Sequence, residues 1–411
     1  MKFASGISDA ATPKAAFEEV ISQTLAQLAG EPCDVAFVFV SAVYQAEWDR
    51  LLAQLHARLH PSAIIGCSGG GIIGTDRELE WVPAVSILAA RMPGVHLSPF
   101  TFTREELALA EPGGFWIDKV GASPQASPVF VMLADPFTCD PVSILGQLNQ
   151  TYRARPVVGG LVSGGHAPGD HVLFCQDQVL REGAVGLAMT GNITMDTIVS
   201  QGCRPIGRPY VVTEAEENLM IRLAGKQAIT VLHDVLSSLS SEDRDLAQQG
   251  SIFGGVVINE MRPAFSSGDF LIRNIVGIDP SSGAVAISDG IQVGQTFQFH
   301  LRDANTSREE LKKLLHQHNE ASAEMLPSGG LVFSCLGRGK SLYGVANHDV
   351  KVIRTMRGKF PMGGFFCNGE IGPVGVRNFV HGYTASLGLF RPLGAAVHPA
   401  PQGTSSSLSP S

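Results

Sequence analysis

The sequence has little positive charge and no long apolar run. Lysine and arginine together number 30 against 38 acidic residues, so the 411-residue chain has a formal net charge of −8. The basic patch that nucleic acids and anionic membranes require is therefore not expected. No uncharged apolar run reaches the roughly 18 residues of a membrane helix, and the N-terminus lacks the apolar core of a signal peptide. We expect a cytoplasmic protein with neither nucleic acid nor membrane as a partner.

Cysteine occurs in no useful pattern. The seven cysteines are scattered singly, without a C-x-x-C pair. An odd number of isolated cysteines indicates neither a disulfide framework nor a zinc ribbon. His316 and His318 lie two apart on a predicted helix, so they point in different directions and do not form a metal pair. No metal and no cofactor is expected.

Glycine-rich strand ends are what the sequence does contain. Apolar runs at 331–335 and 362–367 each open into a polar turn, and a helical pattern with Asn347 as N-cap separates them at 347–357. Strand, helix and strand at this spacing predict a crossover, which makes the two strands parallel and places both carboxyl ends at one edge of a sheet. Such edges are where parallel sheets bind ligands.

The same order occurs twice earlier in the chain. Gly66 and Gly159 lie 93 residues apart, as do Phe37 and Phe130, and Gly363 takes the corresponding place in the third segment. An internal duplication is the economical interpretation. The alternative is that buried strands entering glycine turns resemble one another by chance.

We therefore predict a mixed α/β (α+β) fold of two domains, with internally repeated strand-helix-strand units and added antiparallel strands. A helical N-terminal segment, 1–30, is expected to dock on a first domain at 31–212, which holds two repeats. A second domain at 213–395 begins with a predicted helix at 216–223. The Pro- and Ser-rich tail, 396–411, is expected to be disordered.

Three candidate sites have competing interpretations. Ser68 occupies the serine of a nucleophile elbow, although no helix pattern follows it as that motif requires. Cys335 and Cys367 would be nucleophiles only if a nearby cation lowered their pKa, and free cysteines at strand ends are commonly buried instead. Arg338 and Glu370 suit the carboxylate and the ammonium of one ligand, unless they only bridge each other.

Four segments carry a family resemblance: 65–70, 156–161, 333–338 and 364–373. The chain resembles the FIST family (F-box and intracellular signal transduction), with its FIST N-terminal and FIST C-terminal domains, over about residues 3–390. The family is regarded as a sensory module for small ligands, proposed to include amino acids. The resemblance implies a sensory protein for an amino acid or similar zwitterion, without catalysis of its own. No kinase, receiver or F-box segment is apparent, so a separate signalling protein is one route by which a signal could leave.

From the strand ends we expect ligand contacts at or just before the polar turns, at Cys67, Ser68, Gly69, Asp135, Gly160, Ser163, Cys335, Gly337, Arg338, Gly364, Asn368, Gly369 and Glu370. Two other classes of function stay open. One is a hydrolase or thiol enzyme that uses Ser68, Cys335 or Cys367. The other is an interaction scaffold whose glycine turns serve only close backbone packing.

Overall fold

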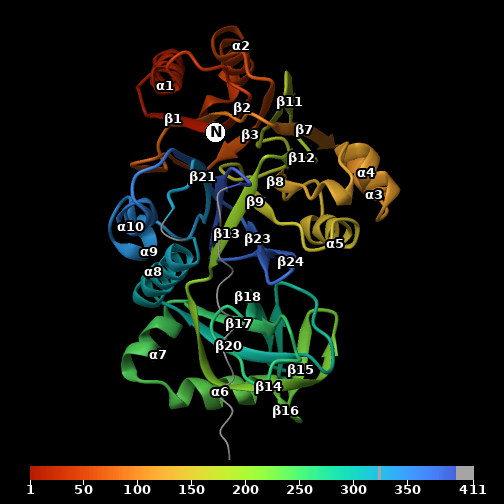
Figure 1. Cartoon of the computed structure of the whole chain (residues 1–411). Coiled ribbons are helices and arrows are strands. Elements are labelled where there is room, and N and C mark those ends of the chain that lie inside the picture. Colours follow the sequence, from red (N-terminus) through yellow and green to blue (C-terminus); the bar gives the residue numbers. More distant parts are fainter. Residues whose placement is uncertain (323–324, 395–411) are drawn as a thin grey trace, which may run out of the picture.

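The computed structural model describes residues 1–322 and 325–394. Three mixed sheets with surrounding helices form one body, and a fourth sheet forms a module below it in Figure 1. The fold is mixed α and β with two domains, as the sequence predicts. The tail predicted to be disordered, 396–411, lies outside the described residues. Within the described residues, no helix is long and apolar enough to cross a bilayer.

Each sheet of the body is built on one strand-helix-strand unit, and the two strands of each unit are parallel. The parallel arrangement predicted from the spacing is confirmed. In chain order, the units consist of β2 (Val35–Ser41), α2 (Trp48–Leu59) and β3 (Ala63–Gly69); β8 (Val129–Ala134), α5 (Pro141–Thr151) and β9 (Val157–Leu161); and β21 (Gly329–Cys335), α10 (His348–Arg357) and β22 (Met362–Cys367). We call them the first, second and third unit.

Two antiparallel strands extend each sheet beyond the first strand of its unit. The inner ones are β6 (Val85–Arg91), β12 (Ala184–Gly191) and β25 (Ala385–Arg391), and the outer ones are β1 (Lys2–Ser8), β7 (Val95–Phe102) and β13 (Thr194–Ser200). Strand β1 was not predicted, because its small residues hide a strand within the segment 1–30. Helix α1 (Pro13–Leu28) follows it, with Thr12 accepting the Ala15 N–H as its N-cap.

A hairpin leaves the carboxyl end of each unit and joins a neighbouring sheet. Strands β4 (Gly71–Ile73) and β5 (Glu78–Glu80) leave the first unit and pair with β22 of the third. Strands β10 (Leu173–Cys175) and β11 (Gln178–Leu180) leave the second and pair with β3 of the first. Strands β23 (Glu370–Val374) and β24 (Arg377–His381) leave the third and pair with β9 of the second. The exchange closes a cycle, so each sheet depends on both others.

One glycine recurs at the same place in every unit. A Cβ added at Gly66 would lie 2.0 Å from the Val38 carbonyl oxygen on the neighbouring strand. The distance is 1.8 Å from Gly159 to the Met132 oxygen and 1.8 Å from Gly364 to the Val332 oxygen. No side chain fits there, so the repeated glycine is a steric requirement of the fold.

The register predicted from sequence is partly wrong. Gly364, and not Gly363, matches Gly66 and Gly159. Phe37 packs in the central core, whereas Phe130 faces the outer layer under the helices. The reason is that the partner of the glycine lies 28 residues before it in the first unit but 27 residues before it in the second. A shift of one residue sends a strand side chain to the opposite face.

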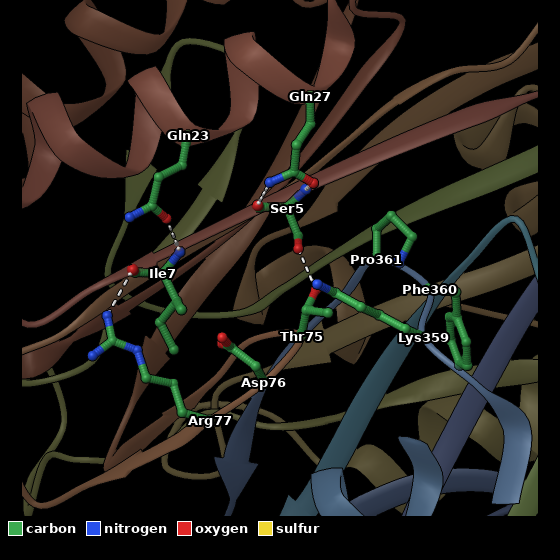
Figure 2. A pocket seen from close by; sticks show the side chains of 10 residues that line it. All are labelled: Ser5, Ile7, Gln23, Gln27, Thr75, Asp76, Arg77, Lys359, Phe360 and Pro361. Carbon is green, nitrogen blue, oxygen red and sulfur yellow. Dashed lines mark hydrogen bonds between the residues drawn. The ribbon is translucent and has the colours of Figure 1, made fainter. Parts of the chain in front are cut away.

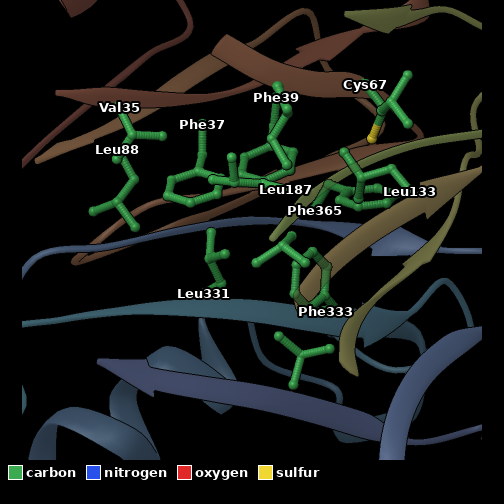
Figure 3. Close-up of a cluster of buried hydrophobic side chains, with 14 of the residues drawn as sticks. Val35, Phe37, Phe39, Cys67, Leu88, Leu133, Leu187, Leu331, Phe333 and Phe365 are labelled. Atoms are coloured by element: carbon green, nitrogen blue, oxygen red, sulfur yellow. The ribbon is translucent and has the colours of Figure 1, made fainter. Parts of the chain in front are cut away.

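The central core lies between the three sheets (Figure 3). Phe37, Phe39, Leu133, Phe333 and Phe365 meet there from all three units. Helices cover the outer faces: α1 and α2 over the first sheet, α4 (Gly114–Val120) and α5 over the second, and α8 (Ala304–Ala321) and α10 over the third. Because both faces of each sheet are buried, its strands are continuous apolar runs.

The fourth sheet is inserted between β13 and α8 of the third unit. Its strands are antiparallel, as the sequence predicts, and β15 pairs back with β14, which closes the sheet into a barrel. Helix α6 (Ala228–Ser238) packs on the barrel interior. The strand order is β14 (Cys203–Glu216), β20 (Thr296–Arg302), β17 (Ile252–Val257), β18 (Phe270–Asp279), β19 (Ala284–Ile287), β15 (Leu219–Leu223) and β16 (Lys226–Gln227). We call residues 203–302 the barrel module.

The helix predicted at 216–223 is wrong. This segment is a hairpin between β14 and β15, and Glu217 at its turn has a φ of 51°. A left-handed residue cannot lie inside a helix, and the β-branched residues before it favour strands.

Candidate functional site

A cleft of about 310 Å³ lies where the carboxyl ends of the three units meet. We call it the three-unit cleft, because each unit contributes a loop to it. Its lining comes from residues 41–43, 69–70 and 81–83 of the first unit, 164–166 of the second, and Leu336 and Asn368 of the third. The loops that follow β3, β9, β21 and β22 thus share one edge, as the sequence predicts.

Ser163 ties the loops of the three units together. Its buried hydroxyl accepts the Gly70 N–H of the first unit at 3.0 Å and donates to the Phe366 carbonyl of the third. Asn368 adds a second tie, because its Nδ2 donates to the Val162 carbonyl at 2.9 Å. The walls of the cleft are therefore held in place by hydrogen bonds between units.

Several polar groups of the cleft have no partner within the protein. Among residues 1–322 and 325–394, none donates to Asn368 Oδ1, and none accepts from the backbone N–H groups of Gly164 and Gly165 or bonds to the His166 ring. Gly164 has a φ of 91° and lies against Gly69, where an added Cβ would be 3.0 Å from the Gly69 carbonyl. Free donors and an acceptor at a concave surface are what a polar ligand needs.

The rim of the cleft is apolar. Val43, Trp81 and Val82 are 69%, 70% and 42% exposed. Trp81 also has a φ of 59°, a conformation that is a genuine outlier for a bulky residue. Strained residues of this kind cluster at ligand sites, where the surrounding structure holds them in place.

Comparison of the units shows which features of the cleft the fold does not require. From the repeated glycine to the start of the exchanged hairpin there are 6 residues in the first and third units but 14 in the second. The extra residues include the glycine loop at 164–166. Glu370 is a second exception, because Ile72 and Leu173 occupy the matching positions in the central core.

Of the thirteen predicted ligand residues, Gly69 and Asn368 line the cleft. Ser68 is buried, and its Oγ contacts the Ser163 carbonyl at 3.4 Å and accepts the Val172 N–H at 3.2 Å. Asp135 is buried too, and its carboxylate bonds to His171 Nδ1. Cys67, Gly160, Gly364 and Cys335 are buried within strands, Gly337 binds Arg302, and Gly369 lines a different pocket.

Arg338 and Glu370 do not bridge each other. Arg338 is fully buried, and its guanidinium donates to both carboxylate oxygens of Asp349, at 2.9 and 3.0 Å, and to Ser307 Oγ at 2.9 Å. Glu370 is also fully buried and accepts the Thr384 N–H at 3.0 Å. That Arg338 and Glu370 contact ligand stays a prediction, and in this conformation neither side chain reaches the cleft.

Burial raises the pKa of Glu370 to about 8, although the Thr384 N–H and the charge of Arg338 favour its ionised form. The folded chain then binds this proton more tightly than the unfolded chain. The free energy of unfolding should be highest below the ordinary glutamate pKa and should fall as the pH rises to about 8.

Glu370→Gln should remove this part of the pH dependence and make the protein more stable than wild type above about pH 8. Urea unfolding of both proteins between about pH 5 and pH 9 measures it, with exposed Glu31→Gln as the control. Parallel curves for wild type and Glu370→Gln would contradict the assignment.

A larger hollow of about 500 Å³ lies at the opposite ends of the strands (Figure 2). Its polar side chains have a structural use. Gln23 and Gln27 bond to the backbone of the edge strand β1, and Arg77 donates to the Ile7 carbonyl at 3.0 Å. Such contacts cover a sheet edge that would otherwise pair with another chain. A similar hollow recurs at the matching hairpin of the third unit, so we regard it as a consequence of the fold.

Sequence reasoning missed Trp81, the glycine loop at 164–166 and Asp349. A signal was present for the loop, because Gly164 and Gly165 follow a buried strand as Gly69 and Gly70 do. Asp349 stands in the first turn of a predicted helix that faces Arg338. Nothing in the sequence places Trp81 beside the cleft.

Two family models together span every loop of the cleft: the FIST N domain matches residues 34–226 and the FIST C domain residues 228–373. Relatives include Uncharacterized protein Rv0628c of Mycobacterium tuberculosis, 35% identical over 392 residues, which are 95% of this chain and 100% of the relative. Uncharacterized protein Mb0898c of Mycobacterium bovis is 35% identical over 393 residues, 95% of this chain and 99% of the relative.

Proposed function

The chain belongs to the FIST family, whose domains are associated with signal transduction and the sensing of small ligands, and from this premise we propose that the three-unit cleft binds an amino acid or similar zwitterion. The observation that carries the proposal is the convergence of unpaired polar groups and an exposed tryptophan at the one place where loops of all three units meet. A ligand there touches every unit at once.

The cleft offers a place for each part of a zwitterion. The free N–H groups of Gly164 and Gly165 suit a carboxylate, because consecutive backbone N–H groups bind anions. Asn368 Oδ1 suits the ammonium group. Trp81 and Val43 suit an apolar side chain, since aromatic rings contribute most to small-molecule contacts.

Two observations favour binding over catalysis. Among the described residues, no histidine or carboxylate bonds to Ser68 Oγ, whose contacts are both backbone groups. Burial raises the pKa of Cys335 to about 12 and that of Cys367 well above its usual range, so neither thiol forms the reactive thiolate readily. A scaffold without a ligand would not need the unpaired groups of the cleft.

We further propose that the protein works in the cytoplasm and that a separate signalling protein reads its occupancy. The seven cysteines are all free in the structure, which suits a reducing compartment.

The test is a thermal-shift screen with the twenty amino acids, followed by calorimetric titration of those that stabilise the protein. Ligand at 100 times its dissociation constant adds about 2.7 kcal/mol of stability. We expect Asn368→Ala to lose a hydrogen bond to a charged group and to weaken binding by roughly 1.5–3 kcal/mol. Trp81→Ala should weaken binding of amino acids with large apolar side chains most.

Matched controls are Asn192→Ala, an exposed asparagine whose Nδ2 also donates to a backbone carbonyl, and exposed Leu109→Ala. Both lie outside the cleft and should bind like wild type. If no amino acid stabilises the wild type, or if all four variants bind equally well, the cleft is not an amino acid site.

A further inference from the structure

A second pocket, of about 200 Å³, lies between the barrel module and the body. Its walls are residues 272–274 and 288–289 of the barrel and residues 368–369 and 380–383 of the third unit, with Val142 at the side. We call it the interdomain pocket. Asn368 lines it on one side and the three-unit cleft on the other. The volume equals that of about six liquid waters, so it suits a molecule of a few heavy atoms.

Direct contacts between the two domains frame this pocket. Tyr383 of the body donates to Asn274 Oδ1 of the barrel, and its ring lies 4.7 Å from the Arg302 guanidinium. Arg273 of the barrel donates to the Val380 carbonyl of the body at 3.3 Å. A molecule in the pocket would therefore touch both sides of an existing interface.

His381 presents a buried acceptor at the pocket. The residue is 3% exposed, and its Nε2 lies 3.0 Å from the Gly372 carbonyl. A carbonyl oxygen only accepts, so Nε2 carries the proton and Nδ1 carries the lone pair. Nδ1 has no partner among the described residues. Burial lowers the pKa of His381 to about 4, so the ring is neutral near pH 7. An unpaired buried acceptor costs free energy that a ligand donor would recover.

Arg273 presents a free donor at the same pocket. Its Nε donates to Asp289 Oδ2 at 2.7 Å, and Nη1 donates to the carbonyls of Ile272 and Val380. Nη2 bonds to no described residue. The charge of Arg273 also lowers the pKa of His381, which is consistent with their sharing one pocket. Guanidinium groups bind carboxylates strongly.

We propose that the interdomain pocket binds a small carboxylic acid that carries a hydroxyl or amino group next to its carboxylate. The carboxylate meets Arg273 Nη2, and the neighbouring O–H or N–H donates to His381 Nδ1. This site is independent of the three-unit cleft and does not rest on the function proposed for it. Its occupant joins the barrel module to the body.

The experiment follows the ring nitrogens of His381 by long-range proton–nitrogen correlation in protein labelled with nitrogen-15 histidine. Glycolate, glycine and acetate are added separately up to about 20 mM, which detects millimolar dissociation constants. The spectrum of His381→Gln assigns the signals. We expect glycolate or glycine to shift the Nδ1 signal in a saturable way, since each brings a donor. Acetate lacks that donor and should leave the signal in place.

Arg273→Gln should weaken that binding about tenfold or more, and Arg273→Lys, which keeps the charge without the planar fork, should restore it only in part. Arg222→Gln removes the same charge from an exposed ion pair elsewhere on the barrel and should bind like wild type. Retention of the His381 Nε2 signal shows that each variant is folded. The proposal is overturned if neither glycolate nor glycine shifts Nδ1, if acetate does so equally, or if folded Arg273→Gln binds as wild type does.

Discussion

Gly364→Ala is expected to lower the free energy of unfolding by about 4 kcal/mol or more, which is a large part of the stability of an ordinary domain. The new Cβ would lie 1.8 Å from the Val332 carbonyl oxygen, less than half a normal contact distance. The oxygen belongs to the backbone of a buried strand and cannot rotate away. Relief requires β21 and β22 to separate, and β22 also holds the hairpin of the first unit.

Gly146→Ala is the matched control. It is the same substitution in helix α5, where an added Cβ meets nothing within 4 Å. Alanine is the better helix former, so this variant should gain about 0.5–1 kcal/mol. Urea unfolding followed by circular dichroism compares the two. A Gly364→Ala protein as stable as Gly146→Ala would show that the repeated glycine is not a steric requirement.

Arg338→Ala is expected to lower the free energy of unfolding by about 3–5 kcal/mol, because it leaves the carboxylate of Asp349 buried without its cation. Asp349 is 2% exposed. Burial alone would raise its pKa, but the charge of Arg338 and hydrogen bonds from His348 and Arg338 hold the pKa well below its usual range. A surface ion pair in the same role would be worth only about 0–1 kcal/mol.

The control for Arg338→Ala is Arg50→Ala, which removes an ion pair with Glu47 whose arginine side chain is 46% exposed. Arg338→Met with Asp349→Leu should recover much of the lost stability, since neither charge is then left alone. Denaturant unfolding measures all three proteins. Equal losses in Arg338→Ala and Arg50→Ala would argue that Arg338 is exposed in solution and available to a ligand.

The sequence predicts the topology of the units better than it predicts their register. Apolar runs and helical spacing are local patterns, and they placed β2, β3, β21 and β22 correctly. The one-residue difference between Phe37 and Phe130 depends on the length of a loop, which a repeat of few identities does not define. The hairpin exchange was also beyond prediction, because nothing in residues 71–80 names the sheet that they join.

For the candidate site, the sequence predicts the region and only some of the residues. Parallel strands bring the loops after them to one edge, so the position of the cleft follows from the spacing. Arg338 illustrates why individual residues are harder. In sequence it stands in a polar, glycine-rich turn, which favours exposure, and only the folding of Asp349 and Ser307 against it shows that it is buried.

The hairpin exchange has a consequence for the origin of the body. If each unit were a separate chain, three copies could lend their hairpins around a ring in the same order and satisfy every pairing between units. Such head-to-tail contacts with a rotation that closes produce a three-fold symmetric homo-oligomer. Fusion of the copies into one chain would keep the ring while releasing two of every three equivalent positions from symmetry. Glu370, the loop at 164–166 and the insertion of the barrel module occupy positions released in this way.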